Sequence, residues 1–118
     1  MPDAVSHWQI LSQDPEKTQG FLHALFGWDV SADNGLGYRM ITTNAPGGID
    51  GGLWPLPAGM TPFVQLFVDV QDIGSSLHTA ERLGAVVVMP RQVLPDGDEM
   101  AIIRSPDGIT FGPFTPAA

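Results

Sequence analysis

The chain has 118 residues, of which 43% are hydrophobic and 15% are charged, a composition typical of one globular domain. Its net charge is −8 with only five lysine and arginine residues, too few cations to neutralise the phosphates of a nucleic acid. The sequence has no cysteine, no apolar run near the roughly 20 residues of a membrane span, and no signal-peptide pattern at its start. We therefore expect a cytoplasmic protein that binds neither nucleic acids nor membranes.

The first predicted element is a strand over residues 7–13, where Trp8 and Ile10 alternate with His7 and Gln9. A helix is predicted over residues 15–26, because Asp14 is a good N-cap, a proline follows it, and a glycine comes directly after residue 26. The helix carries an apolar stripe at helical spacing, formed by Phe21, Leu22, Leu25 and Phe26. Further strands are predicted over residues 28–30, 37–43 and 47–54.

The second half of the sequence repeats this order. A strand over residues 63–70 precedes a helix over residues 73–83, which Asp72 caps and Gly84 ends. One face of this helix carries Ile73, Leu77, Ala80 and Leu83. Strands are predicted over residues 85–94 and 99–105, and residues 106–114 are predicted as a turn followed by a last strand. The two capping aspartates are 58 residues apart, and this near-constant offset indicates an internal repeat.

The repeat predicts an α+β fold of tandem βαβββ units that form a curved, mostly antiparallel sheet around a cavity. We expect a single domain over residues 1–118, with unit one at about 5–55 and unit two at about 62–115. One helix covers only one face of a four-stranded sheet, so the other face needs a second sheet to share it. The chain is short, and we expect a second copy in a homodimer to complete the cavity.

Three segments resemble a known group of proteins: "DPEKTQGFLHALFGW", "VQDIGSSLHTAERLGAVVV" and "SPDGITFGPF". They are similar to the vicinal oxygen chelate superfamily, which includes glyoxalase I, extradiol dioxygenases and bleomycin resistance proteins. With the connecting strands the resemblance covers nearly the whole chain. It is specific for the fold and weak for the function, because this fold hosts many activities.

The resemblance implies four positions where metal-dependent members carry ligands. These are a first-strand residue in each unit, here His7 and Gln65, and a last-strand glutamate in each unit, here Gly52 and Gly112. One strong donor, one neutral amide and two glycines would hold a divalent ion weakly. We therefore expect no metal and no other cofactor. Asp50 is the only nearby carboxylate that could compensate, although it is more simply a turn or strand-edge residue.

Strand alternation predicts which side chains line the cavity. The predicted ligand-binding residues are His7, Asp50, Gly52, Trp54, Gln65, Phe67, Thr110 and Gly112. In this interpretation the two glycines make room for a ligand. For each aromatic residue, packing in a core or an interface is the simpler alternative.

Two functions remain open from the sequence. The first is a small-molecule-binding protein of the glyoxalase/bleomycin resistance type without a family-type metal site. The alternative is a lyase, isomerase or dioxygenase-type enzyme that uses His7 as a general base or keeps a reduced metal site. Whether the protein is an enzyme stays undecided at this point.

Overall fold

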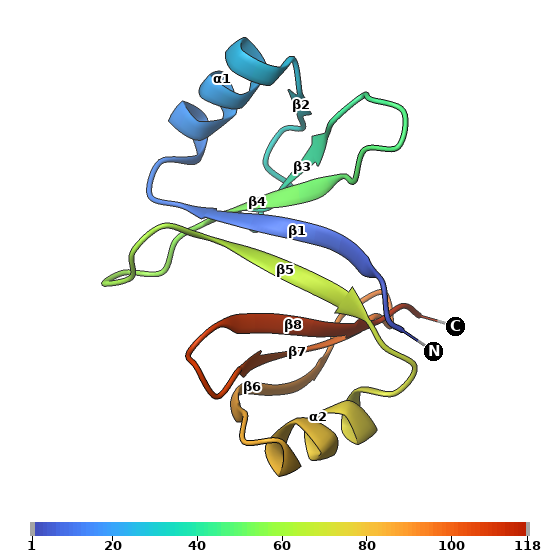
Figure 1. The fold of residues 1–118 in the computed structure, drawn as a ribbon. Coiled ribbons are helices and arrows are strands. Elements are labelled where there is room, and N and C mark those ends of the chain that lie inside the picture. The colour runs from blue at the N-terminus through green and yellow to red at the C-terminus, as the bar shows by residue number, and fades with distance from the viewer. Residues whose placement is uncertain (1, 118) are drawn as a thin grey trace. The chain divides into compact units, whose positions relative to one another are not determined.

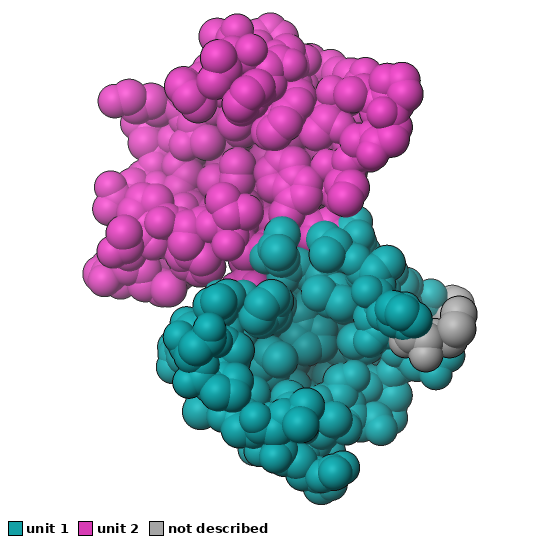
Figure 2. Space-filling model, viewed as in Figure 1, with its two compact units in different colours: residues 1–6, 66–118 teal, residues 7–65 magenta. Residues whose placement is uncertain are grey.

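The computed structural model describes residues 2–117, and the chain divides into two compact units. Figure 2 colours them separately: the N-terminal unit comprises His7–Gln65, and the C-terminal unit comprises Leu66–Ala118 together with Met1–Ser6. The division falls at Gln65, a few residues into the second half predicted to begin at about residue 62. Residues near the start of the chain bind within the C-terminal unit, since the Asp69 amide donates to the Ala4 carbonyl at 2.9 Å. That the two units act as one domain stays a prediction.

The N-terminal unit has the predicted order of one strand, one helix and three strands (Figure 1). Its strands pair in the order β2-β3-β4-β1, with two antiparallel pairings and a parallel pairing of β1 with β4. Residues 47–50 lie outside any strand, so the fourth strand begins at Gly51 rather than at the predicted residue 47. The elements are β1 (Val5–Ser12), α1 (Pro15–Phe26), β2 (Asp29–Val30), β3 (Arg39–Thr42) and β4 (Gly51–Pro55).

The C-terminal unit repeats this arrangement. Its strands pair in the order β5-β8-β7-β6, again with two antiparallel pairings and a parallel one, between β5 and β8. The elements are β5 (Phe63–Asp69), which begins before the division, α2 (Ile73–Arg82), β6 (Val86–Val93), β7 (Glu99–Arg104) and β8 (Thr110–Thr115). The predicted tandem βαβββ architecture is confirmed.

Both helices begin where the capping residues predicted. The Asp14 carboxylate accepts from the Lys17 amide at 3.2 Å, and the Asp72 carboxylate accepts from the Gly74 amide at 3.2 Å. At the end of α1, Gly27 adopts a left-handed conformation with φ of 73°, which favours glycine. No helix within residues 2–117 is long and apolar enough to span a bilayer.

The core of the N-terminal unit lies between α1 and its strands. Leu22, Ile41 and Leu53 are at most 5% exposed. Trp8, Ile10, Trp28 and Val30 pack against these three residues. The apolar stripe predicted on α1 is thus mostly not buried, because Leu22 alone faces the core, while Phe21, Leu25 and Phe26 are more than half exposed. Spacing identifies an apolar face, but only the position of the helix decides how much of it is covered.

Candidate functional site

The strands of the N-terminal unit have two distinct faces, as alternation predicted. Trp8 lies opposite Gly51 and Gln9 lies opposite Gly52 across β1 and β4. Since Trp8 and Leu53 belong to the core beneath α1, His7, Gln9, Gly52 and Trp54 lie on the opposite face. We call this the helix-free face of the unit.

The ring of Tyr38 occupies the space beside Gly52 on this face. A Cβ atom at Gly52 would lie 2.4 Å from Cε1 and 2.5 Å from Oη of Tyr38. The same ring contacts Trp54, with ring centroids 4.7 Å apart. Burial raises the pKa of the Tyr38 phenol above its ordinary value.

The loop before β3 positions this tyrosine. The Asn34 side chain accepts from the Tyr38 amide at 3.2 Å, and the Asn34 amide donates to the Tyr38 carbonyl at 3.0 Å. Asp33 accepts from the amides of Gly35 and Gly37 at 2.8 Å each. The sequence analysis missed Tyr38. The sequence did contain a pattern that could have identified it: alternation along residues 38–42 places Tyr38 and Met40 on one face. In the structure Met40 pairs with Gly52, which puts this face beside the glycine.

The C-terminal unit has an equivalent arrangement around Gly112. Phe67 lies opposite Gly112 across β5 and β8, and a Cβ atom at Gly112 would lie 2.5 Å from the Phe67 ring. Phe67 is only 1% exposed, and its ring meets the edge of Phe114 at a centroid distance of 6.4 Å. Phe67 therefore has a packing role and offers no surface to a ligand in this structure.

These two contacts correct the interpretation that Gly52 and Gly112 leave room for a ligand. The space beside each glycine is filled by a ring of the same unit. A glutamate at either position would overlap the ring as it lies in this structure, so the residues present do not fit the four-ligand metal site that the resemblance implies. Within residues 2–117, no three histidine, aspartate or glutamate side chains are grouped so that they could hold a metal ion.

The remaining predicted site residues lie in separate surroundings. His7 on β1 is half-buried, whereas Gln65 on β5 is only 4% exposed. Asp50 is exposed and its Oδ1 accepts from the amide and the hydroxyl of Thr43, at 3.0 and 3.2 Å, which is the role of a turn residue. Thr110 begins β8, where it pairs with Arg104. Within single units, the structure thus brings together Gly52 with Trp54, and Phe67 with Gly112.

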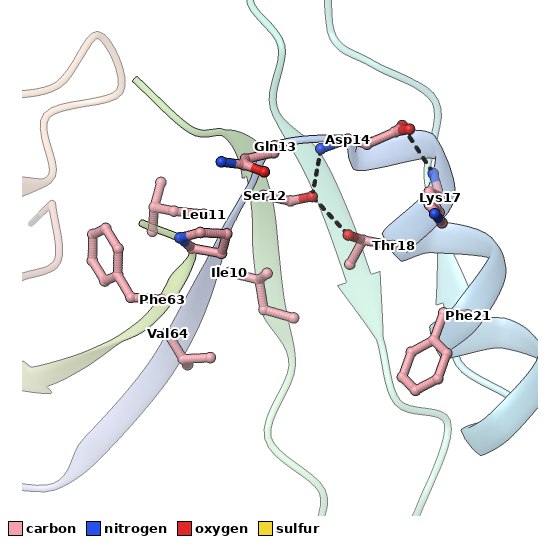
Figure 3. Close-up of a pocket in the computed structure, with 11 residues that line it drawn as sticks. Ile10, Leu11, Ser12, Gln13, Asp14, Lys17, Thr18, Phe21, Phe63 and Val64 are labelled. Carbon is pink, nitrogen blue, oxygen red and sulfur yellow. Dashed lines mark hydrogen bonds between the residues drawn. The ribbon is translucent and has the colours of Figure 1, made fainter. Parts of the chain in front are cut away.

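On the other side of the N-terminal unit, a groove of about 630 Å³ runs beside the start of α1 (Figure 3). Its polar groups mostly bind one another: the Ser12 and Thr18 hydroxyls are 2.6 Å apart, and the Asp14 amide donates to Ser12 at 3.0 Å. None of the predicted site residues lines it. The lining residues are Ile10, Leu11, Ser12, Gln13, Asp14, Lys17, Thr18, Phe21, Pro62, Phe63 and Val64.

Comparison with known proteins gives structural relatives only. No protein-family model and no curated protein sequence matches the chain. A hypothetical protein from Bacillus halodurans is similar in structure, with a TM-score of 0.72 and 11% identity over 100% of this chain and 97% of that one. A glyoxalase/bleomycin resistance protein/dioxygenase superfamily member from Vibrio splendidus has a TM-score of 0.69 and 17% identity, over 97% and 98% of the two chains.

A methylmalonyl-CoA epimerase from Mycobacterium tuberculosis is also similar, with a TM-score of 0.64 and 17% identity over 97% of this chain and 88% of that one. Identities this low establish the fold and leave the activity open. The repeated βαβββ order, the two helix caps and these structural relatives agree with one another. The chain has the fold of the vicinal oxygen chelate superfamily.

Proposed function

We propose that this chain is a cytoplasmic, homodimeric small-molecule-binding protein of the glyoxalase/bleomycin resistance type, which works without a family-type metal site. The observation that carries the proposal is the filling of both glutamate positions by aromatic rings. A Cβ atom added at Gly52 would lie 2.4 Å from the Tyr38 ring, and one added at Gly112 would lie 2.5 Å from the Phe67 ring. Without carboxylate donors at these two positions, the strand faces suit ligand binding better than metal-assisted chemistry.

The helix-free face of the N-terminal unit supports binding of a flat organic molecule. Tyr38 and Trp54 are partly exposed and form an aromatic pair, and Met40 beside them is 60% exposed. Aromatic and thioether side chains favour stacking and sulfur contacts with an aromatic ligand. We propose that His7, on the same face, adds a hydrogen bond.

The charge of the chain indicates which ligands this face accepts. One structural relative, an epimerase from Streptomyces coelicolor, was solved with a propionyl-CoA derivative. Coenzyme A carries several negative charges, and this chain has a net charge of −8 with five lysine and arginine residues. Long-range repulsion disfavours such an anion. We therefore propose that the ligand is an uncharged or cationic aromatic compound.

A binding experiment with matched variants tests the proposal. We expect naphthol to shift the amide NMR signals of Tyr38, Met40 and Trp54 in the purified protein, and Trp54→Ala to weaken binding at least tenfold. Leu36→Ala is the control, since Leu36 is 77% exposed in the same unit and should leave binding unchanged.

Metal analysis of the same preparation distinguishes a metal-free binding protein from a metal-dependent enzyme. We expect less than stoichiometric zinc, nickel, iron or manganese without added chelator. A stoichiometric metal that is lost on His7→Ala would refute the metal-free site. Binding that survives Trp54→Ala would refute the aromatic face as the binding surface.

A further inference from the structure

The C-terminal unit contains a cleft beneath α2 that the proposed function does not use. It has a volume of about 410 Å³, which is within the size range of small-molecule sites. Apolar side chains of the strands form one wall, and Ser76, Thr79 and Ala80 of α2 form the other. The strand residues are Val68, Val70, Ile103, Phe111 and Pro113.

The internal repeat explains why this space is open. Position for position, Ala80 corresponds to Leu22 of α1, and Thr79 corresponds to Phe21. In the N-terminal unit Leu22 is 5% exposed and fills the space between helix and strands. Ala80 lacks three of the four side-chain carbons of leucine, so the equivalent space stays empty even though Phe111 stands where the N-terminal unit has Gly51.

The lining of the two grooves confirms this difference between the units. The groove beside α1 is not lined by Leu22, Ile41 or Leu53, the core residues of its unit. The cleft beneath α2 is lined by Ala80, which corresponds to Leu22, and by strand residues of the unit's interior such as the buried Pro113. The cleft therefore reaches under its helix.

One end of the cleft leads to an acidic mouth. A hollow of about 640 Å³ shares Asp3, Val70, Ser75 and Ser76 with the cleft, and it is also bordered by Asp69 and Asp72. Asp3 and Asp72 are exposed and place two carboxylates at the mouth, whereas Oδ1 of Asp69 is buried. The helix N-terminus contributes about half a positive charge there, which the two carboxylates outweigh. Glu99, and to a smaller degree Asp72, raise the pKa of Arg91. This arginine is already bound to Glu99.

We infer that this cleft binds a small organic cation, with its apolar body beneath α2 and its ammonium group at the mouth beside Asp3 and Asp72. The apolar wall disfavours a hydrated inorganic ion, and the two carboxylates disfavour an organic anion. The hydroxyl of Ser76, which borders both the cleft and the mouth, can accept a hydrogen bond from the ammonium group. This site lies within one unit and is separate from the helix-free face of the N-terminal unit.

Three naphthalene probes of different charge test the ligand class. We expect naphthylmethylammonium to shift the amide NMR signals of Thr79, Ala80 and Phe111 in the full chain. Naphthylmethanol should bind roughly two- to fivefold more weakly at low salt, the effect expected of partly exposed charge pairs, and naphthoate more weakly still. Equal binding of the amine and the carboxylate, no shift at millimolar probe, or shifts confined to Tyr38 and Trp54 would overturn the inference.

Two kinds of variant test the location. Ala80→Leu copies the N-terminal unit and should reduce binding of the amine at least tenfold, whereas Ala24→Leu on the exposed side of α1 should not. If Ala80→Leu fails to fold, Thr79→Leu narrows the same cleft from an exposed helix position. Asp3→Asn should weaken binding of the amine and leave binding of the alcohol unchanged. Glu16→Gln, in the other unit, is the charge-matched control. Wild-type affinity in Ala80→Leu or Thr79→Leu would overturn the site.

Discussion

Replacing Gly112 by alanine tests whether the Phe67 ring fills the space beside Gly112. The added Cβ would lie 2.5 Å from two ring carbons of Phe67, closer than carbon atoms approach in folded proteins. Phe67 is 1% exposed, so its ring cannot move aside into solvent. Overpacking of this kind costs about 1–3 kcal/mol, and alanine regains about 0.4–1 kcal/mol by restricting the unfolded chain.

We therefore expect Gly112→Ala to lower the free energy of unfolding by about 1–2 kcal/mol, or roughly 4–8 °C in Tm. Chemical denaturation and calorimetry measure both quantities. Gly52→Ala should cost less, because Tyr38 is only partly buried and its ring can shift. Gly20→Ala is the matched control: nothing lies within 4 Å of its added Cβ, and it should stabilise α1 by about 0.5–1 kcal/mol.

A double-mutant cycle identifies the ring as the cause. Phe67→Leu shortens the side chain that faces Gly112, so the cost of Gly112→Ala should be smaller in the Phe67→Leu background. A Gly112→Ala variant as stable as the wild type would refute the reasoning. The same conclusion would follow if the two changes were additive, because the collision would then not involve Phe67.

Three further predictions concern ionisation, metal and assembly. Tyr38 is the single tyrosine, and tyrosinate absorbance should show it titrating above the ordinary pKa of 10.0. The free energy of unfolding should fall as the pH rises past that value, because the phenol ionises first in the unfolded chain. His7→Ala and Gln65→Ala should weaken ligand binding while chelator leaves Tm unchanged; a chelator-dependent Tm would contradict this. Light scattering at micromolar concentration should give the dimer mass, and a monomer mass would exclude the homodimer that we infer from the exposed Phe21 and Leu25.

The local elements of this protein could be read from its sequence because local interactions determine them. Asp14 and Asp72 start their helices through hydrogen bonds only two or three residues away, and Gly27 ends α1 through its own backbone conformation. Alternation along β1 correctly placed Trp8 and Ile10 on the face opposite His7 and Gln9, since successive side chains of a strand point to opposite faces. The offset between the two aspartates then predicted the tandem architecture.

What fills the faces was decided by tertiary structure alone. The sequence shows a glycine at residue 52, but only the pairing of β3 with β4 brings the Tyr38 ring over it. Likewise, the apolar stripe of α1 is visible in its spacing, while the position of the helix leaves Phe21 exposed and Leu22 buried. Contacts between residues distant in the chain depend on how the elements pack, and residue spacing within one element carries no information about that packing.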